Sequence, residues 1–499
     1  MVSFLHLVLA LPLLSFIILL LKSRTNKKPA TVPPGPKGLP IIGNLHQLDN
    51  SSLHFQLLNL SKIYGPIFSL RIGLRPAIVI STPGIAKKIL NDHDLDVSRR
   101  PPNLGNQKIS YNGIEIIFSP YNDTWREIRK LVVVHILSFK KVSIFSHVRK
   151  DEVKKMIKKI SGHVCSSKIT NLSEIVLSTS ISIIWRIGFG RKCDEEGAEK
   201  SRIHGLLNET EDIFTSFFIS DHIPFMGWID RLTGLRARVE NAFKRMDMFS
   251  QEVLNEHLDP NRPKETEEGD IVDVLLRLQK QGHLSIDLTH DHIKGVIMDL
   301  IVGGTDTSAS TSVWVMTALM KYPRTMKKAQ EEVRNLYGNK EFIDEEDIQK
   351  LKYLKAVIKE TFRLYPTAPL LPRETNKSFI VDGYEIQPKT LVYVNTWAIH
   401  RDPEAWKDPD EFYPERFLNN DIDFKGRDFE LIPFGAGRRI CPGLPMGIAT
   451  VELIIANLLN SFDWELPIGM APEDIDVEGL PGLVVQKKNH LCLVAKNRK

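Results

Sequence analysis

The 499-residue sequence predicts a mainly α-helical protein with small β-sheets, an α+β fold. Apolar residues recur at helical spacing over residues 288–320, 350–365 and 444–462. A shorter stretch, 379–395, alternates apolar and polar residues and carries Asp382-Gly383, a dipeptide typical of β-hairpin turns. We find no internal repeat and no long low-complexity linker in the sequence.

The N-terminal segment predicts a membrane anchor. Residues 1–21 are almost wholly apolar and have the length of a membrane span. The positive-inside rule places the rest of the chain in the cytosol, because four cations follow directly: Lys22, Arg24, Lys27 and Lys28. The alternative, a cleaved signal peptide, would need a basic leading region and a small-residue cleavage site, and neither is clear. Residues 22–40 then read as a basic, proline-rich hinge.

The segment YNDTWREIRKL predicts a helix that presents Trp125 and Arg129 on one face, four residues apart. An indole N–H and a guanidinium in this arrangement could bind a carboxylate together. The alternative is that the tryptophan packs inward while the arginine faces water.

The centre of the predicted helix 288–320 is unusual. Residues 303–312 read GGTDTSASTS, and two glycines inside a helix cost about 2 kcal/mol together. We therefore expect a kink or a locally broken hydrogen bond there. Asp306 and Thr307 lie at this weak point in apolar surroundings, where polar groups need partners or a function. They indicate either a proton-handling site or a hydroxyl-rich helix that packs closely on a neighbour.

Glu360 and Arg363 lie three residues apart on the predicted helix 350–365 and so share a face. Such a pair is common and is usually a solvated ion pair worth less than about 1 kcal/mol. Downstream, the segment PERF supplies Arg416, which could complete a charged cluster.

Cys441 lies in the stretch FGAGRRICPG, directly before an apolar helical run. Pro442 suits the first position of that helix, so we expect Cys441 at or near the N-cap. A helix N-terminus and nearby arginines lower a thiol pKa from its free value of about 8.5. Zinc and iron–sulfur sites are disfavoured, because the other three cysteines are distant and form no CxxC motif. A nucleophile, a redox thiol, a haem ligand and a structural cysteine all remain open.

Composition excludes some functions. The net charge of +5 is too small to indicate a nucleic-acid partner, and four cysteines in 499 residues favour a reducing compartment. A dinucleotide fingerprint is also lacking, because Ile440 occupies the third glycine position after Gly435 and Gly437.

Together these motifs resemble the cytochrome P450 family of haem-thiolate monooxygenases. FGAGRRICPG matches the family's cysteine-loop pattern FxxGxRxCxG in full, and WREIR, GGTDTS, ETFR and PERF match its other motifs in chain order. The stretches PPGPKGLPIIGNLHQL and DFELIPFGAGRRICPG are similar to plant microsomal A-type members, closest to the subgroup that includes aldoxime-oxidising enzymes of specialised metabolism. The resemblance implies one catalytic haem domain over residues 41–499, although length alone would suggest about three domains.

The resemblance also implies roles for residues. Haem b would lie between the long central helix and the cysteine-loop helix, with Cys441 as axial thiolate and Phe434 shielding the sulfur. Asp306 and Thr307 would guide protons towards oxygen. The haem propionates would be bound by Trp125, Arg129, Arg439 and Arg373. The fold around the cysteine side of the haem would be locked by Glu360, Arg363 and Arg416. Substrate contacts would come from residues 103–113, 300–304, 366–371 and 482–483.

The implied reaction is the insertion of one oxygen atom of O2 into a small hydrophobic metabolite such as a phenylpropanoid, flavonoid, terpenoid or oxime. NADPH would act indirectly, through a separate NADPH-cytochrome P450 reductase. The reductase would dock on a basic face that includes Lys130, Lys140, Lys141 and Arg438. The protein would be a single-pass protein of the endoplasmic reticulum membrane with its catalytic domain in the cytosol. Two alternatives are a haem-thiolate dehydratase or isomerase without net oxygen insertion, and a non-catalytic haem-binding protein.

Overall fold

The computed structural model describes residues 32–192, 198–263, 269–282, 284–338 and 340–498. The predicted anchor, residues 1–21, lies outside the described residues. The described part of the predicted hinge is attached to the first strand of the protein: Ser69 donates hydrogen bonds from its backbone N–H to the Pro34 carbonyl and from its Oγ to the Pro33 carbonyl, both at 2.7 Å.

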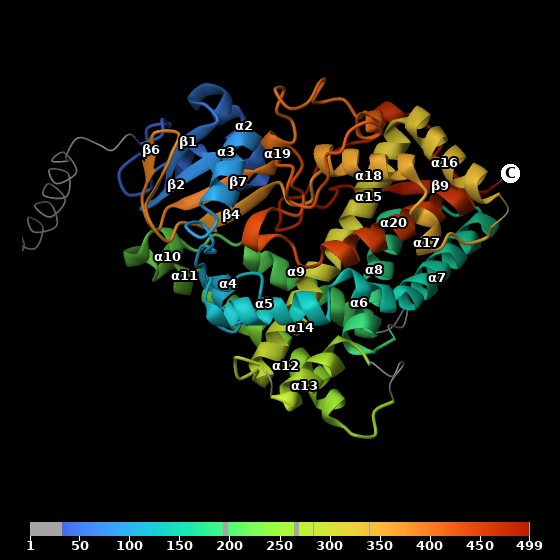
Figure 1. The fold of residues 1–499 in the computed structure, drawn as a ribbon, viewed down its shortest axis with the longest axis horizontal. Helices are drawn as coiled ribbons and strands as arrows, with labels where there is room; N and C mark the ends of the chain where they lie inside the picture. The colour runs from blue at the N-terminus through green and yellow to red at the C-terminus, as the bar shows by residue number, and fades with distance from the viewer. Residues whose placement is uncertain (1–31, 193–197, 264–268, 283, 339, 499) are drawn as a thin grey trace, which may run out of the picture.

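Helices make up most of the described chain, as predicted (Figure 1). Those before the central helix are α2 (Leu53–Tyr64), α3 (Pro83–Lys87), α4 (Leu104–Ile109), α5 (Asp123–His135), α6 (Phe139–Ile144), α7 (Ser146–Cys165), α8 (Leu172–Phe189), α9 (Ala198–Thr215), α10 (Ile219–His222), α11 (Ile229–Leu232), α12 (Leu235–Leu258) and α13 (Ile271–Gln281). The rest are α14 (His290–Gly304), α15 (Asp306–Lys321), α16 (Pro323–Tyr337), α17 (Glu345–Ile348), α18 (Lys352–Leu364), α19 (Thr396–Ile399) and α20 (Leu444–Ser461).

The sheets are small. One sheet has the order β1 (Ile67–Ile72), β2 (Arg75–Ile80), β7 (Leu391–Asn395), β4 (Leu370–Glu374), with β2 and β7 parallel. A second joins β3 (Thr170–Asn171), β9 (Cys492–Asn497) and β8 (Phe462–Glu465). The strands β5 (Phe379–Val381) and β6 (Tyr384–Ile386) form a hairpin. Positive φ angles of 49° at Asp382 and 80° at Gly383 confirm the predicted turn. The strands β1, β2, β4, β6 and β7 lie on one side of the helical body and β9 on the opposite side (Figure 1).

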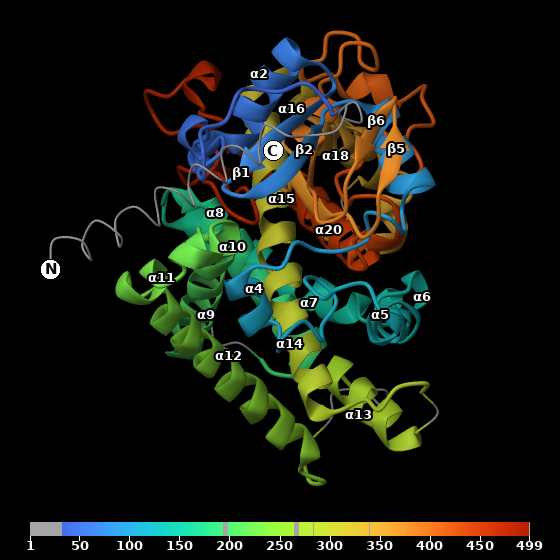
Figure 2. The same cartoon turned by 90° about the vertical axis from the view of Figure 1, so that its left-hand side faces the viewer.

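The predicted weak point of the central helix is confirmed. The helix breaks at Thr305 into α14 and α15, which together form the long column through the molecule in Figure 2. Close packing requires the second glycine, because a Cβ at Gly304 would lie 2.8 Å from Ile184 of α8. The hydroxyls of Thr305 and Thr307 donate to the carbonyls of Ile301 and Gly303, at 2.7 and 2.8 Å.

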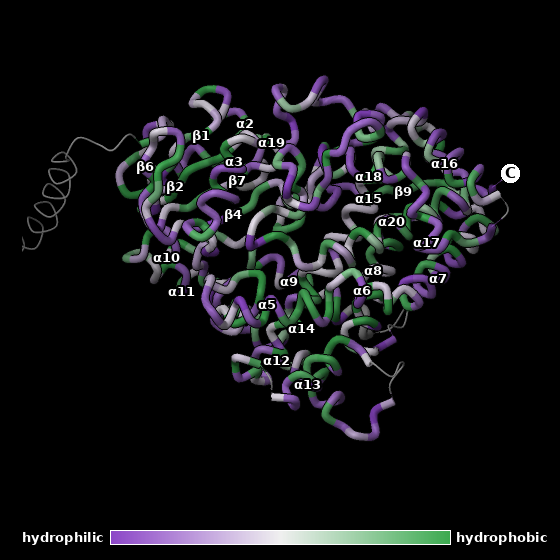
Figure 3. The backbone as a smooth tube through the Cα atoms, viewed as in Figure 1, coloured by the Kyte–Doolittle hydropathy of each residue, from purple (hydrophilic) through white to green (hydrophobic). Residues whose placement is uncertain are grey.

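The two largest hydrophobic clusters meet at this break. Buried residues of α14 pack with α5, α8 and α12, whereas those of α15 pack with α18 and α20. Figure 3 shows hydrophobic stretches along α8, α14 and α20 and a largely hydrophilic outer helix α7. Within the described residues, α8 and α20 are long and apolar enough to span a membrane, but 72% and 67% of them is buried, so both are core helices.

Candidate active site

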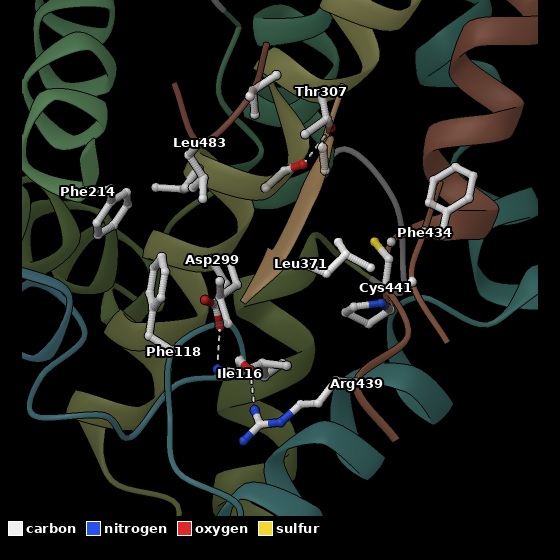
Figure 4. A pocket seen from close by; sticks show the side chains of 18 of the residues that line it. Ile116, Phe118, Phe214, Asp299, Thr307, Leu371, Phe434, Arg439, Cys441 and Leu483 are labelled. Atoms are coloured by element: carbon white, nitrogen blue, oxygen red, sulfur yellow. Dashed lines mark hydrogen bonds between the residues drawn. The ribbon is translucent and has the colours of Figure 1, made fainter. Parts of the chain in front are cut away.

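A cavity of about 550 Å³ lies between the central helix and the loop that precedes α20 (Figure 4). Cys441 and Phe434 line it on the side of the cysteine loop, and Asp299 and Thr307 line it on the side of the central helix. Each of the four segments predicted to contact substrate contributes to the lining. The contributing residues are Asn103 and Asn106; Leu300, Gly303 and Gly304; Thr367, Ala368, Leu370 and Leu371; and Leu483.

At two positions the cysteine loop has a backbone conformation that only glycine adopts easily. Gly435 and Gly437 have φ angles of 72° and 67°, and a Cβ at Gly437 would lie 2.4 Å from the Leu90 carbonyl oxygen. The Cys441 N–H donates to the Phe434 carbonyl at 2.9 Å, which closes the loop and turns the cysteine towards the cavity.

The predicted helix start at Pro442 is wrong by two residues. The helix α20 begins at Leu444 with Gly443 as its N-cap, so Cys441 lies two residues before the cap. The N–H groups of Gly443 and Leu444 still point at the thiol. The chain needs these two extra residues to turn from the cysteine loop into the helix.

The expectation of a thiol pKa below the free value is also wrong for the protein alone. Burial raises the pKa of the Cys441 thiol, and this effect outweighs the lowering by the Gly443 and Leu444 N–H groups and by Arg129. A metal ion bound at the sulfur would favour the thiolate.

An aromatic group flanks the sulfur. The Phe434 ring packs edge-on against Phe362 of α18, with centroids 5.3 Å apart, and lies 5.8 Å from Phe424. This packing fixes Phe434 beside Cys441 on the cavity wall (Figure 4).

Four arginines converge at one end of the cavity: Arg100, Arg129, Arg373 and Arg439. Burial lowers the pKa of all four, to about 10 for Arg100 and about 9 for Arg439, and repulsion by neighbouring arginines lowers it further for Arg100, Arg373 and Arg439. Within the described residues none of them forms a salt bridge with a carboxylate, so this end of the cavity favours an anionic group. Arg100 was not predicted; its neighbour Arg99 turns towards Glu374 instead, 3.6 Å away.

Trp125 and Arg439 are fixed by backbone contacts. The side chain of Asn122 caps α5 by accepting the Trp125 N–H at 2.7 Å, and the indole Nε1 donates to the Ile116 carbonyl at 3.0 Å. Arg439 donates to the carbonyls of Ser98, Ile116 and Ser119 at 2.8, 3.3 and 2.6 Å. The Arg439 guanidinium lies 4.1 Å from the centre of the Trp125 ring. Trp125 itself does not line the cavity, and its indole N–H donates to Ile116, so the structure does not show the predicted joint grip of a carboxylate by this N–H and Arg129.

Asp306 and Thr307 are not brought together at the cavity. Thr307 lines it, whereas Asp306 is buried and hydrogen-bonds the side chain of Glu211 on α9. Burial raises the pKa of Asp306, and burial together with Asp306 raises the pKa of Glu211 to about 8. These two carboxyl groups therefore share a proton directly behind the cavity wall.

The cluster of Glu360, Arg363 and Arg416 is buried, not solvated. Glu360 and Arg363 are 0% exposed, and the carboxylate accepts from Arg363 Nε and Nη2 at 2.8 Å and from Arg416 Nε at 3.1 Å. The prediction that Arg416 completes a charged cluster is confirmed.

Comparisons with known proteins agree with the motifs. The family model described as "Cytochrome P450" matches residues 33–494. The 5-OH-xanthotoxin synthase of Ammi majus is 47% identical over 500 residues, covering 98% of this chain and 97% of that protein. The 6,7,8-trihydroxycoumarin synthase of Pastinaca sativa is 46% identical over 502 residues, covering 99% and 98%. A solved zebra fish cytochrome P450 with abiraterone has a TM-score of 0.73 at 24% identity, covering 89% of this chain and 100% of that chain, and so has the same fold.

Proposed function

The chain belongs to the cytochrome P450 family and is a monooxygenase, and we propose that it oxidises a small aromatic plant metabolite with electrons from NADPH. The fold predicted from the motifs is confirmed. The observation that carries the proposal is the cavity itself, in which Cys441 and the arginine group meet an apolar space beside Thr307.

The residues present fit a haem. Cys441 is the proposed axial ligand, and the arginine group is proposed to hold the two propionates, since four guanidinium groups that form no salt bridge among the described residues favour anions there. Trp125 orients Arg439 through ring stacking, and Phe434 keeps water from the sulfur. When bound, haem activates O2 so that one oxygen atom enters the substrate. The haem domain is proposed to extend over residues 41–499.

The polar groups of the central helix have the proposed task of handling protons. Thr307 Oγ1 donates to the Gly303 carbonyl at 2.8 Å, next to the break in the helix. A rotation about its Cα–Cβ bond frees this proton for an oxygen atom in the cavity. The Glu211–Asp306 pair holds a further proton behind it, at the side of α9.

Thr307→Ala is expected to separate electron consumption from product formation. The variant still binds haem and consumes NADPH, but it diverts electrons into hydrogen peroxide, because a positioned proton donor contributes roughly 10²–10⁴-fold to rate. We expect product formed per NADPH to fall about tenfold or more, whereas Thr307→Ser, which keeps the hydroxyl, stays near wild type. Product, peroxide and NADPH are measured together with added reductase. Unchanged product per NADPH in a folded Thr307→Ala variant rules the proton role out.

The substrate is proposed to be a phenylpropanoid-derived aromatic compound such as a coumarin. The cavity wall next to the central helix is formed largely by apolar side chains, those of Ile116, Phe118, Phe214, Leu300 and Leu483. Two relatives at 46% and 47% identity carry the names of coumarin-oxidising synthases. A screen for ligand-induced shifts of the haem Soret band tests this, with coumarins beside flavonoids, terpenoids and aldoximes. Shifts with the other classes and none with coumarins would exclude the proposed substrate class.

Membrane topology is the next expectation, motivated by the apolar residues 1–21 and the cations that follow them. We propose that the protein is anchored in the endoplasmic reticulum and faces the cytosol, where NADPH-cytochrome P450 reductase docks on a basic face. It should resist alkaline extraction from microsomes and be digested by protease added outside intact vesicles. Glycans on any of the sequons at Asn50, Asn122, Asn171, Asn208 or Asn376 would show the opposite orientation.

A further inference from the structure

Two carboxyl groups lie side by side in the wall of the cavity, contributed by segments far apart in the sequence. Glu115, in the loop before α5, is 0% exposed, and Asp299 lies on α14 and lines the cavity. The loop approaches the helix closely at Gly295, where a Cβ would lie 3.1 Å from the Cβ of Glu115. The two side chains are hydrogen-bonded to each other, which requires one of them to carry a proton.

Burial raises the pKa of Glu115, but its hydrogen-bond donors and nearby cations oppose this effect, so we infer that Glu115 is the ionised partner of the pair. Its carboxylate accepts hydrogen bonds from the Phe118 N–H at 2.8 Å and from the Ile117 N–H. Arg100 and Arg439 interact favourably with its charge. Backbone donors and nearby cations both favour a carboxylate over a carboxylic acid.

Asp299 is therefore the neutral acid. Burial and the neighbouring Glu115 raise the pKa of Asp299 well above its usual value. Its Oδ1 is shielded from the cavity and accepts no hydrogen bond from the described residues, so it is the oxygen that carries the proton towards Glu115. Its Oδ2 accepts the Ile116 N–H at 2.9 Å, as the dashed line in Figure 4 shows.

The Oδ2 atom of Asp299 can accept a further hydrogen bond, and this can influence which substrates bind. A carbonyl oxygen accepts two hydrogen bonds, and Ile116 supplies one of them, whereas the neighbouring Ile117 N–H, which also lies close to Asp299, donates to Glu115. Asp299 is only half-buried because it faces the cavity, and its shielded Oδ1 leaves Oδ2 as the carboxyl oxygen that can meet a ligand. The wall around it is apolar, with Phe118, Leu300 and Phe214 among the lining residues. An unused acceptor on such a wall selects for a ligand that brings a donor.

We propose that Asp299 determines substrate specificity as a neutral carboxylic acid, its proton held by Glu115, while its Oδ2 accepts a hydrogen bond from a hydroxyl group of an aromatic substrate. This inference rests on the proposed function and deepens it. A ligand whose hydroxyl is methylated leaves Oδ2 without a donor and is bound less tightly. A cationic ligand gains nothing, because the acid carries no charge.

The test compares each hydroxycoumarin with its methyl ether, beginning with 7-hydroxycoumarin and 7-methoxycoumarin. Dissociation constants are measured from the Soret shift of the full-length holoenzyme in detergent. For wild type we expect the hydroxylated member of at least one pair to bind about tenfold more tightly. Asp299→Leu should reduce that ratio to about one. Asp299→Asn should keep it, because the amide Nδ2 donates to Glu115 while Oδ1 accepts from Ile116 and the ligand.

Each result decides between the alternatives. An unchanged ratio in Asp299→Leu overturns the proposal, and so does a wild type without preference in any pair. Loss of the preference in Asp299→Asn also overturns the proposal, since the carboxyl would then act as an anion. The Asp299→Asn measurement decides even if Asp299→Leu fails to fold, which its reduced carbon-monoxide spectrum would reveal. If no coumarin shifts the Soret band, the proposed substrate class is contradicted, and the specificity proposal, which rests on that class, falls with it.

Discussion

Cys441→Ser is expected to abolish thiolate ligation of haem and all monooxygenase turnover. The reduced carbon-monoxide adduct of the wild type should show the red-shifted Soret band of thiolate-ligated haem, and the variant should lose it. A serine hydroxyl is smaller and far less acidic than a thiol, so it is a much weaker metal ligand in this position. No other cysteine lines the cavity among the described residues.

Cys165→Ser is the matched control, because Cys165 is exposed at the end of α7 and lies away from the cavity. It should retain the red-shifted band and normal turnover. Retention of the band in Cys441→Ser would refute the assignment, as would a colourless wild-type protein.

Glu360→Ala is expected to destabilise the fold by about 3–5 kcal/mol, the range for breaking a buried ion pair by removing one partner. The carboxylate accepts hydrogen bonds from Arg363, Arg416 and the Tyr413 N–H, the last at 2.8 Å. Without it, two guanidinium groups remain in the interior with only carbonyl partners, such as His400 and Glu411 for Arg363, both at 2.9 Å. We expect low haem incorporation and a lower midpoint of thermal unfolding, followed at the Soret band.

Glu331→Ala provides the comparison. Glu331 and Lys327 form an exposed pair on α16, with a distance of 3.9 Å between Oε1 and Nζ. Exposed pairs contribute at most about 1 kcal/mol, so this variant should unfold close to the wild-type midpoint. Equal effects of the two substitutions would contradict a special role for the buried cluster.

Several features could be predicted because they depend on neighbours in the chain. Two adjacent glycines and a run of hydroxyl residues weaken any helix, and the break at Thr305 lies within that run. The dipeptide Asp382-Gly383 adopts the positive φ angles of a hairpin turn wherever two strands flank it. The cysteine loop has a positive φ angle at Gly437, a fixed glycine of its pattern, which helps to make that pattern specific enough to indicate the family.

Other features were decided by the tertiary structure. Arg99 and Arg100 are adjacent in sequence, yet Arg100 lines the cavity whereas Arg99 turns towards Glu374. The direction of each side chain is set by its contacts with segments that are distant in the sequence. Asp306 faces Glu211 of α9, and the chain between them gives no sign of this pairing.

The sequence by itself determined the fold class, through periodic burial, and it indicated the family through the resemblance of its motifs, with Cys441 as the proposed sulfur ligand. Only the tertiary structure decided the charge states inside the cavity. Burial raises the pKa of the Cys441 thiol although a helix N-terminus follows, and burial together with Glu115 raises the pKa of Asp299 well above its usual value. Both outcomes depend on how much water the surrounding segments exclude, and that property belongs to the packed chain and to no stretch of sequence alone.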